Sequence, residues 1–175
     1  MKKTAKIALC GLFTAIAFGL SWVEMLIPFD SLGIPGVKLG LANLAVMAAL
    51  YLLGLLPAAA VSLARILLSW FVFGSFTSFV YSLCGGVLSL AVMYLLKRAG
   101  FFGHAGVSVS GAVAHNAGQL AAACALLHGT DILYYAPVLL AAATLAGALN
   151  GILLGRILPP LQKRFALNDE NKKTT

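Results

Sequence analysis

The chain has 175 residues, of which 61% are hydrophobic and 10% are charged. A soluble domain usually carries about 25% charged residues, so this composition is typical of a membrane protein. Crossing a hydrocarbon core of about 30 Å takes about 20 apolar residues, so the chain holds at most about six or seven spans and leaves no room for a soluble catalytic domain. With only two Glu and three Asp in the chain, we expect no metal site and no other cofactor.

The net charge of +7 is unevenly distributed along the chain. Ten of the twelve Lys and Arg residues form three clusters: Lys2, Lys3 and Lys6; Lys97 and Arg98; Arg156, Lys163, Arg164, Lys172 and Lys173. Basic clusters of this kind flank membrane spans on the cytoplasmic side. The charge therefore indicates membrane topology, and we expect no nucleic-acid partner.

Apolar runs predict six transmembrane helices, at about residues 7–27, 39–56, 58–75, 79–96, 106–127 and 132–158. With six spans both termini share one side, and all three basic clusters then face the cytoplasm, as expected in a cell membrane. We therefore expect an all-α membrane protein, a six-helix transmembrane bundle forming one domain over residues 1–165, with a disordered polar tail over 166–175. A cleaved signal peptide is the disfavoured alternative, because the first apolar run continues to Ile27.

Two of the predicted helices carry small residues at every fourth position, which makes a smooth stripe on one face. The members are Gly11, Ala15 and Gly19 in the first helix, and Ala143, Gly147, Gly151 and Gly155 in the last. Such stripes let another helix approach closely in lipid. One interpretation is packing within the bundle; the other is that a stripe, more readily the first, docks a separate membrane partner.

The second and third predicted helices each contain polar residues that are candidates for substrate binding. Lys38 stands at the outer end of the second helix, and Asn43 lies just over one turn deeper. Arg65 lies near the middle of the third helix, with Ser62 and Ser69 on its face. An arginine at that depth costs at least about 2.5 kcal/mol and needs a partner, water or a ligand. The alternatives are therefore anion binding and a buried structural ion pair.

The last three predicted helices supply further candidates. The fifth contains His115, Asn116 and Gln119, which offer both hydrogen-bond donors and acceptors to a polar head group or to neighbouring helices. Tyr81 in the fourth helix and Asn150 in the sixth are weaker candidates for substrate contact. Because the chain has neither a Walker A sequence nor a deep acidic residue, we expect energy for transport to come from a partner protein.

Three stretches of the sequence together resemble one known family. They are Pro35-Gly-Val-Lys-Leu-Gly-Leu-Ala-Asn43, Tyr81-Ser-Leu-Cys-Gly-Gly-Val-Leu-Ser89 and Gly111-Ala-Val-Ala-His-Asn-Ala-Gly-Gln119. The chain is similar over about residues 5–160 to the Gx transporter family, also named heptaprenyl diphosphate synthase component I. The resemblance implies a fold similar to the substrate-binding S-components of energy-coupling factor (ECF) vitamin transporters.

In those transporters the S-component captures a substrate and works with a transmembrane coupling protein and two ATPases. By resemblance, Gly11, Ala15 and Gly19 would dock the coupling protein, while the polar residues in the membrane would line the substrate pocket. The synthase name is harder to support, because prenyl elongation needs clustered aspartates to hold Mg²⁺ and the chain has no DDxxD-like sequence.

These observations leave two functional hypotheses. The first is an S-component-like transporter subunit, not itself an enzyme, that takes up a small anionic or polar-headed molecule such as an isoprenoid, quinone or vitamin precursor. The second is a non-catalytic accessory subunit that holds a prenyl diphosphate synthase at the membrane. Both place the chain in contact with membrane lipid.

Overall fold

The computed structural model describes residues 3–27, 39–127 and 130–171. Over these residues the protein is helical and contains no strand, which confirms the all-α class predicted from composition. The elements are α1 (Lys3–Leu26), α2 (Leu41–Leu53), α3 (Leu55–Phe73), α4 (Phe76–Ala99), α5 (His104–Leu127), the short 3-10 helix η2 (Asp131–Tyr135) and α6 (Ala136–Asn171).

Four stretches of helix in the described chain are long and apolar enough to span a membrane. They are α1, α3, α4 and the segment Ile132–Arg164, which includes most of α6. The other two helices differ: α2 is apolar but has only 13 residues, while α5 has 24 residues and carries a group of polar side chains. The chain is thus a helical protein with membrane-spanning character.

Glycine and serine mark the boundaries between the helices. Gly54 has φ 95° and separates α2 from α3, so the break between the second and third helices lies three residues before the one predicted at residue 57. Pro57 then lies in the first turn of α3, where its missing N–H removes no intrahelical hydrogen bond. Ser75 begins α4 by accepting a hydrogen bond from the Ser78 N–H at 3.2 Å, and Gly100, with φ 75°, ends it.

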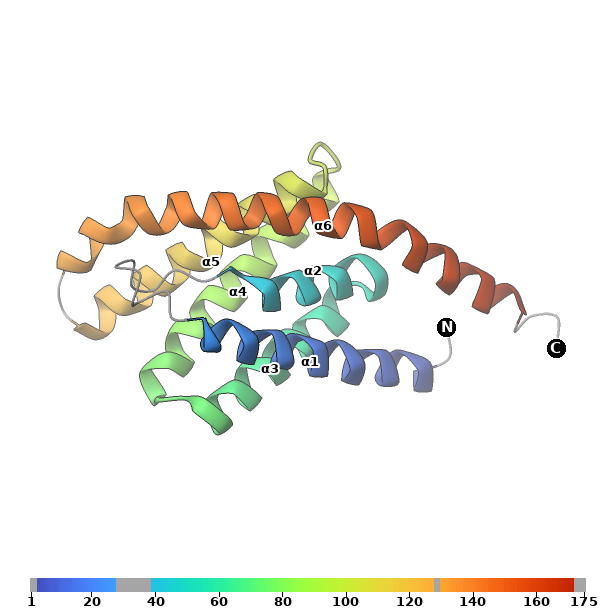
Figure 1. Ribbon diagram of the computed structural model, residues 1–175, viewed down its shortest axis with the longest axis horizontal. Helices are drawn as coiled ribbons and strands as arrows, with labels where there is room; N and C mark the ends of the chain where they lie inside the picture. Colours follow the sequence, from blue (N-terminus) through green and yellow to red (C-terminus); the bar gives the residue numbers. More distant parts are fainter. Residues whose placement is uncertain (1–2, 28–38, 128–129, 172–175) are drawn as a thin grey trace.

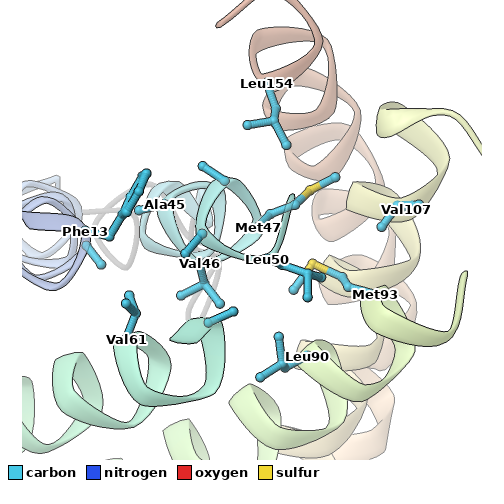
Figure 2. Packing of buried hydrophobic residues seen from close by; sticks show 14 of the residues in the cluster. Phe13, Ala45, Val46, Met47, Leu50, Val61, Leu90, Met93, Val107 and Leu154 are labelled. Carbon is cyan, nitrogen blue, oxygen red and sulfur yellow. The ribbon is translucent and has the colours of Figure 1, made fainter. Parts of the chain in front are cut away.

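Helix α2 lies at the centre of the molecule between two groups of helices (Figure 1). One group is α1 with α3, and the other is α4, α5 and α6, in which α5 packs along both of its neighbours. Met47 and Leu50 of α2 are fully buried and lie between Phe13 of α1 on one side and Met93 of α4 and Leu154 of α6 on the other (Figure 2). The hydrophobic core is therefore built around α2.

A lysine of α4 closes the far end of α2. Lys97 Nζ donates a hydrogen bond of 2.8 Å to the Leu50 carbonyl oxygen, one of the last carbonyls of α2 that its own helix leaves unpaired. The same ammonium group lies 4.8 Å from the centre of the Tyr51 ring, and that ring contacts His104 at the start of α5. These contacts tie α2 to α4 and α5 at one end of the bundle.

Helix α6 extends well beyond the apolar run that predicted it. Pro159 and Pro160 lie inside it, and the helix changes direction in this region (Figure 1) because a proline ring removes a hydrogen bond and clashes with the preceding turn. The backbone stays helical to Asn171, so it includes residues 166–171 of the segment expected to be a tail. The beginning of α1 and the end of α6 lie at the same end of the bundle (Figure 1).

Candidate functional site

A cavity of about 210 Å³ lies between the two groups of helices, beside the first residues of α2. All six α-helices contribute polar side chains to its wall. Because an apolar cavity of about 150 Å³ binds benzene, this volume suits a small molecule, or part of one, of roughly ten non-hydrogen atoms. Partly enclosed sites of this kind, mostly apolar with a few convergent polar groups, are typical of ligand binding.

Most of the residues predicted from the sequence to bind substrate meet at this cavity. Six of the eight line it: Asn43, Arg65, His115, Asn116, Gln119 and Asn150. Tyr81 is not part of the wall, to which α4 contributes Ser78, Phe79 and Ser82 instead. Lys38 lies outside the described residues.

Arg65 is buried in α3, with only 9% of its surface exposed. Its Nε atom and the Ser69 hydroxyl, one turn further along α3, have no hydrogen-bond partner within the described part of the chain. A buried polar group without a partner costs about 1–3 kcal/mol. Both residues line the cavity, so a ligand with oxygen acceptors could satisfy these two groups.

Glu24 lies near the end of α1 and also lines the cavity. Its Oε1 atom accepts a hydrogen bond of 3.0 Å from the Leu41 N–H, the first N–H of α2. An acidic group at this position stabilises the start of a helix. Glu24 also attracts the Arg65 guanidinium electrostatically, but the two form no direct ion pair. A buried structural ion pair, the alternative explanation for Arg65, is therefore not formed among the described residues.

Two hydrogen bonds hold the start of α2 against the opposite group of helices. Gly40 has φ 70°, a left-handed conformation that favours glycine, and it precedes the first residue of α2. The neighbouring Leu39 carbonyl accepts a 2.8 Å hydrogen bond from Asn150 Nδ2 of α6. Asn43 Nδ2 lies 3.2 Å from the Ser89 hydroxyl of α4. The two asparagines thus line the cavity and connect the helices around it.

Helices α4 and α5 approach each other closely, and this contact helps to position the polar residues of α5. A methyl group at Gly118 would lie 2.8 Å from the Cys84 carbonyl oxygen, and one at Gly85 would lie 2.7 Å from the His115 carbonyl oxygen. Only glycine permits this spacing, which brings His115 and Gln119 against α4 beside the cavity. Asn116 donates a 3.0 Å hydrogen bond to the Leu139 carbonyl of α6, so interhelical bonding accounts for part of its role.

Several residues of the wall were not among the predicted site residues. These residues are Glu24, Trp70, Phe73 and Phe79, which all lie near helix ends, where charged and aromatic residues are common in any membrane protein. Ser69 could have been predicted, because it lies four residues after Arg65 and therefore on the same helix face. The remaining contacts depend on how the helices pack, which the spacing of residues within one helix does not show.

The two stripes of small residues have different surroundings. On α6, a methyl group at Gly147 would lie 2.8 Å from the Val109 Cα atom of α5, and one at Gly151 would clash with Ala105. That stripe therefore packs within the bundle. On α1, methyl groups at Gly11 and Gly19 would meet nothing within 4 Å in the described chain, and Ala15 between them is exposed.

Comparison with known proteins identifies one family. The family model named heptaprenyl diphosphate synthase component I matches residues 13–157. The chain belongs to this family. In this member of the heptaprenyl diphosphate synthase component I family, the matched region includes every residue that lines the cavity. Searches of curated proteins and of solved structures found no match.

Proposed function

We propose that the protein is the substrate-binding membrane subunit of a transporter, similar to an ECF S-component, and that it binds a small anionic or polar-headed molecule. The observation that carries this proposal is the cavity, because it gathers six separately predicted polar residues between two groups of helices. Arg65 would attract negative charge, while Asn43, His115, Asn116, Gln119 and Asn150 would orient the molecule. Lys38, in the segment before α2, remains a proposed contact.

The partner in this proposal is a transmembrane coupling protein with two ATPases. Gly11, Ala15 and Gly19 would form the docking face, because this side of α1 is open in the described chain and the small residues allow a foreign helix to approach closely. ATP hydrolysis by these partners would supply the energy for transport, because the chain has no Walker A sequence of its own.

We further propose that the protein crosses the cytoplasmic membrane six times, with both termini in the cytoplasm. The common end of α1 and α6 fits this arrangement (Figure 1), as do the basic residues Lys97, Arg98 and Arg156. In this arrangement α5 crosses the membrane with its polar side chains facing the cavity, and α2 lies buried at the centre of the bundle.

The second candidate is a non-catalytic accessory subunit of a heptaprenyl diphosphate synthase. The description of the family favours it. In this role the protein would anchor a soluble synthase that supplies the aspartates this chain lacks. The cavity would then have no transported substrate, and its buried Arg65 and Ser69 would be left without an explanation.

Gentle affinity purification from native membranes, followed by mass spectrometry of the bound proteins, separates the two candidates. We expect a coupling protein and two ATPases with the wild type, and their loss when Gly11 and Gly19 are both changed to leucine. The control replaces Ile16 and Val23, which are exposed apolar residues of α1 outside this small-residue stripe, with alanine. Recovery of a soluble prenyl synthase without an ATPase would favour the accessory subunit.

A further inference from the structure

We infer that the molecule bound in the cavity carries an anionic oxygen group and, at a separate position, an N–H or O–H hydrogen-bond donor. This inference rests on the proposed function, because it takes the cavity to be the substrate site. It concerns the distribution of donors and acceptors over the cavity wall, which the polarity of the individual residues does not reveal.

Two donors of the wall that lack an acceptor within the described chain lie on α3. Arg65 is more than nine-tenths buried, and within the described chain its Nε–H has no acceptor. The Ser69 hydroxyl is also buried, and within the described chain it too has no hydrogen-bond partner. Because the two residues are four apart on one helix, they present neighbouring donors to a single group. A carboxylate or a similar oxygen anion offers two or more acceptor oxygens and satisfies both.

Two amide acceptors of the wall lie on the opposite group of helices, on α5 and α6. Asn116 Nδ2 faces the Leu139 carbonyl at 3.0 Å, and Asn150 Nδ2 faces the Leu39 carbonyl at 2.8 Å. A carbonyl oxygen can only accept, so the nitrogen of each amide must face it, and the orientation of both amides is determined. Within the described chain neither Oδ1 atom forms a hydrogen bond. These two oxygens are therefore available to a donor on the ligand.

The charge of the wall limits how negative the ligand can be. The described lining contains one side chain with a formal positive charge, Arg65, and one with a negative charge, Glu24. These two charges attract each other and sum to zero. A diphosphate would bring several negative charges to a wall whose described residues hold one partly neutralised cation, so these described residues suit a single anionic group. A donor elsewhere on the ligand, such as an ammonium group, would be favoured by Glu24.

The rest of the wall suits a flat apolar body. Trp70 and Phe79 contact each other with ring centres 5.0 Å apart, and both line the cavity with Phe73. Aromatic side chains bind ligand rings through stacked or tilted contacts. Small phenyl compounds are therefore suitable probes of the polar requirement, because all of them can occupy the aromatic part of the wall equally.

The test compares four probes that share a phenyl ring and the two carbons attached to it. 3-Phenylpropionate carries only the anion, phenethylamine only the donor, and phenylalanine and phenyllactate carry both. Binding to the purified full chain in detergent is measured by isothermal titration and by the midpoint of thermal unfolding. We expect phenylalanine or phenyllactate to bind about tenfold or more tightly than both single-group probes.

Variants assign the effect to the cavity. Arg65→Met should abolish the advantage of the anionic group, while Arg98→Met, which removes an exposed arginine outside the cavity, should preserve it. The inference is overturned if a single-group probe binds as tightly as both two-group probes, or if none of the four binds. If the inference is overturned but affinity purification of the wild type still recovers the coupling protein and ATPases, the transporter proposal stands and only the proposed class of ligand is wrong.

Discussion

Arg65 places a positive charge inside an apolar helix without an ion pair among the described residues. Desolvating such a charge costs free energy, of which the attraction of Glu24 offsets a part and a ligand or a partner would offset more. We therefore predict that Arg65→Met leaves the ligand-free protein as stable as the wild type or more stable. The midpoint of thermal unfolding in detergent measures this directly, with Arg98→Met as the control at an exposed position.

A structural role for Arg65 predicts the opposite result. Removing one member of a buried ion pair costs about 3–5 kcal/mol because the other charge is left uncompensated. A large fall in the unfolding temperature of Arg65→Met, with no change in Arg98→Met, would show that Arg65 holds the fold together. Arg65 would then be a structural residue and not a ligand contact.

Gly40 is the residue whose backbone conformation allows α2 to begin beside the cavity. Its φ of 70° is strained for any residue with a Cβ atom, and that atom would lie 3.4 Å from Asn150 Nδ2. We predict that Gly40→Ala destabilises the protein by about 1–2 kcal/mol, which lowers the unfolding temperature by several degrees. Gly103→Ala is the matched control, because that glycine lies in open space without a positive φ. Equal midpoints for the two variants would contradict this account of Gly40.

At the scale of the helices, glycines on α5 and α1 should respond in opposite ways to the same substitution. Gly118→Ala would bring a methyl group against the Cys84 carbonyl and force α4 and α5 apart, which we expect to cost about 1–3 kcal/mol. Gly11→Ala adds its methyl group in open space, so the better helix propensity of alanine should make it neutral or stabilising. Unfolding of the two isolated variants in parallel checks the prediction. A loss of stability in Gly11→Ala would mean that this face is already covered.

The sequence predicted the helices well because apolar length and glycine positions are local properties. Each of the six predicted runs corresponds to one α-helix, and the break between the second and third occurs at Gly54. The ends were less predictable: α2 is shorter than its apolar run, and α6 continues through Pro159 and beyond. Helix ends depend on capping contacts with other segments, such as Glu24 with Leu41, which hydropathy does not reveal.

At the scale of the whole molecule, the topology proposal places the turn after α4 in the cytoplasm and the segment between α5 and α6 outside. We predict that Thr130→Cys reacts with a membrane-impermeant maleimide in intact cells, whereas Arg98→Cys reacts only after permeabilisation. Both variants require a background in which Cys10, Cys84 and Cys124 are replaced by alanine. Labelling of Arg98→Cys in intact cells would refute the orientation.

The sequence predicted those residues of the candidate site whose side chains cost free energy to place inside a membrane. Arg65 and His115 stand out in apolar helices because membranes rarely tolerate such side chains without a reason. Glu24 and Trp70 were not predicted, because a carboxylate or an aromatic ring near a helix end is ordinary in a membrane protein. Their place in the wall depends on how α1 and α3 pack around α2, which is a property of the whole bundle.

We propose that the cavity binds a small molecule through Arg65. The most direct measurement is mass spectrometry of the small molecules retained after gentle purification from the native membrane, for the wild type, Arg65→Met and Arg98→Met. The account predicts one compound held by the wild type and by Arg98→Met, and reduced at least about tenfold in Arg65→Met. Equal retention by all three proteins, or no retained compound in the wild type, would contradict it.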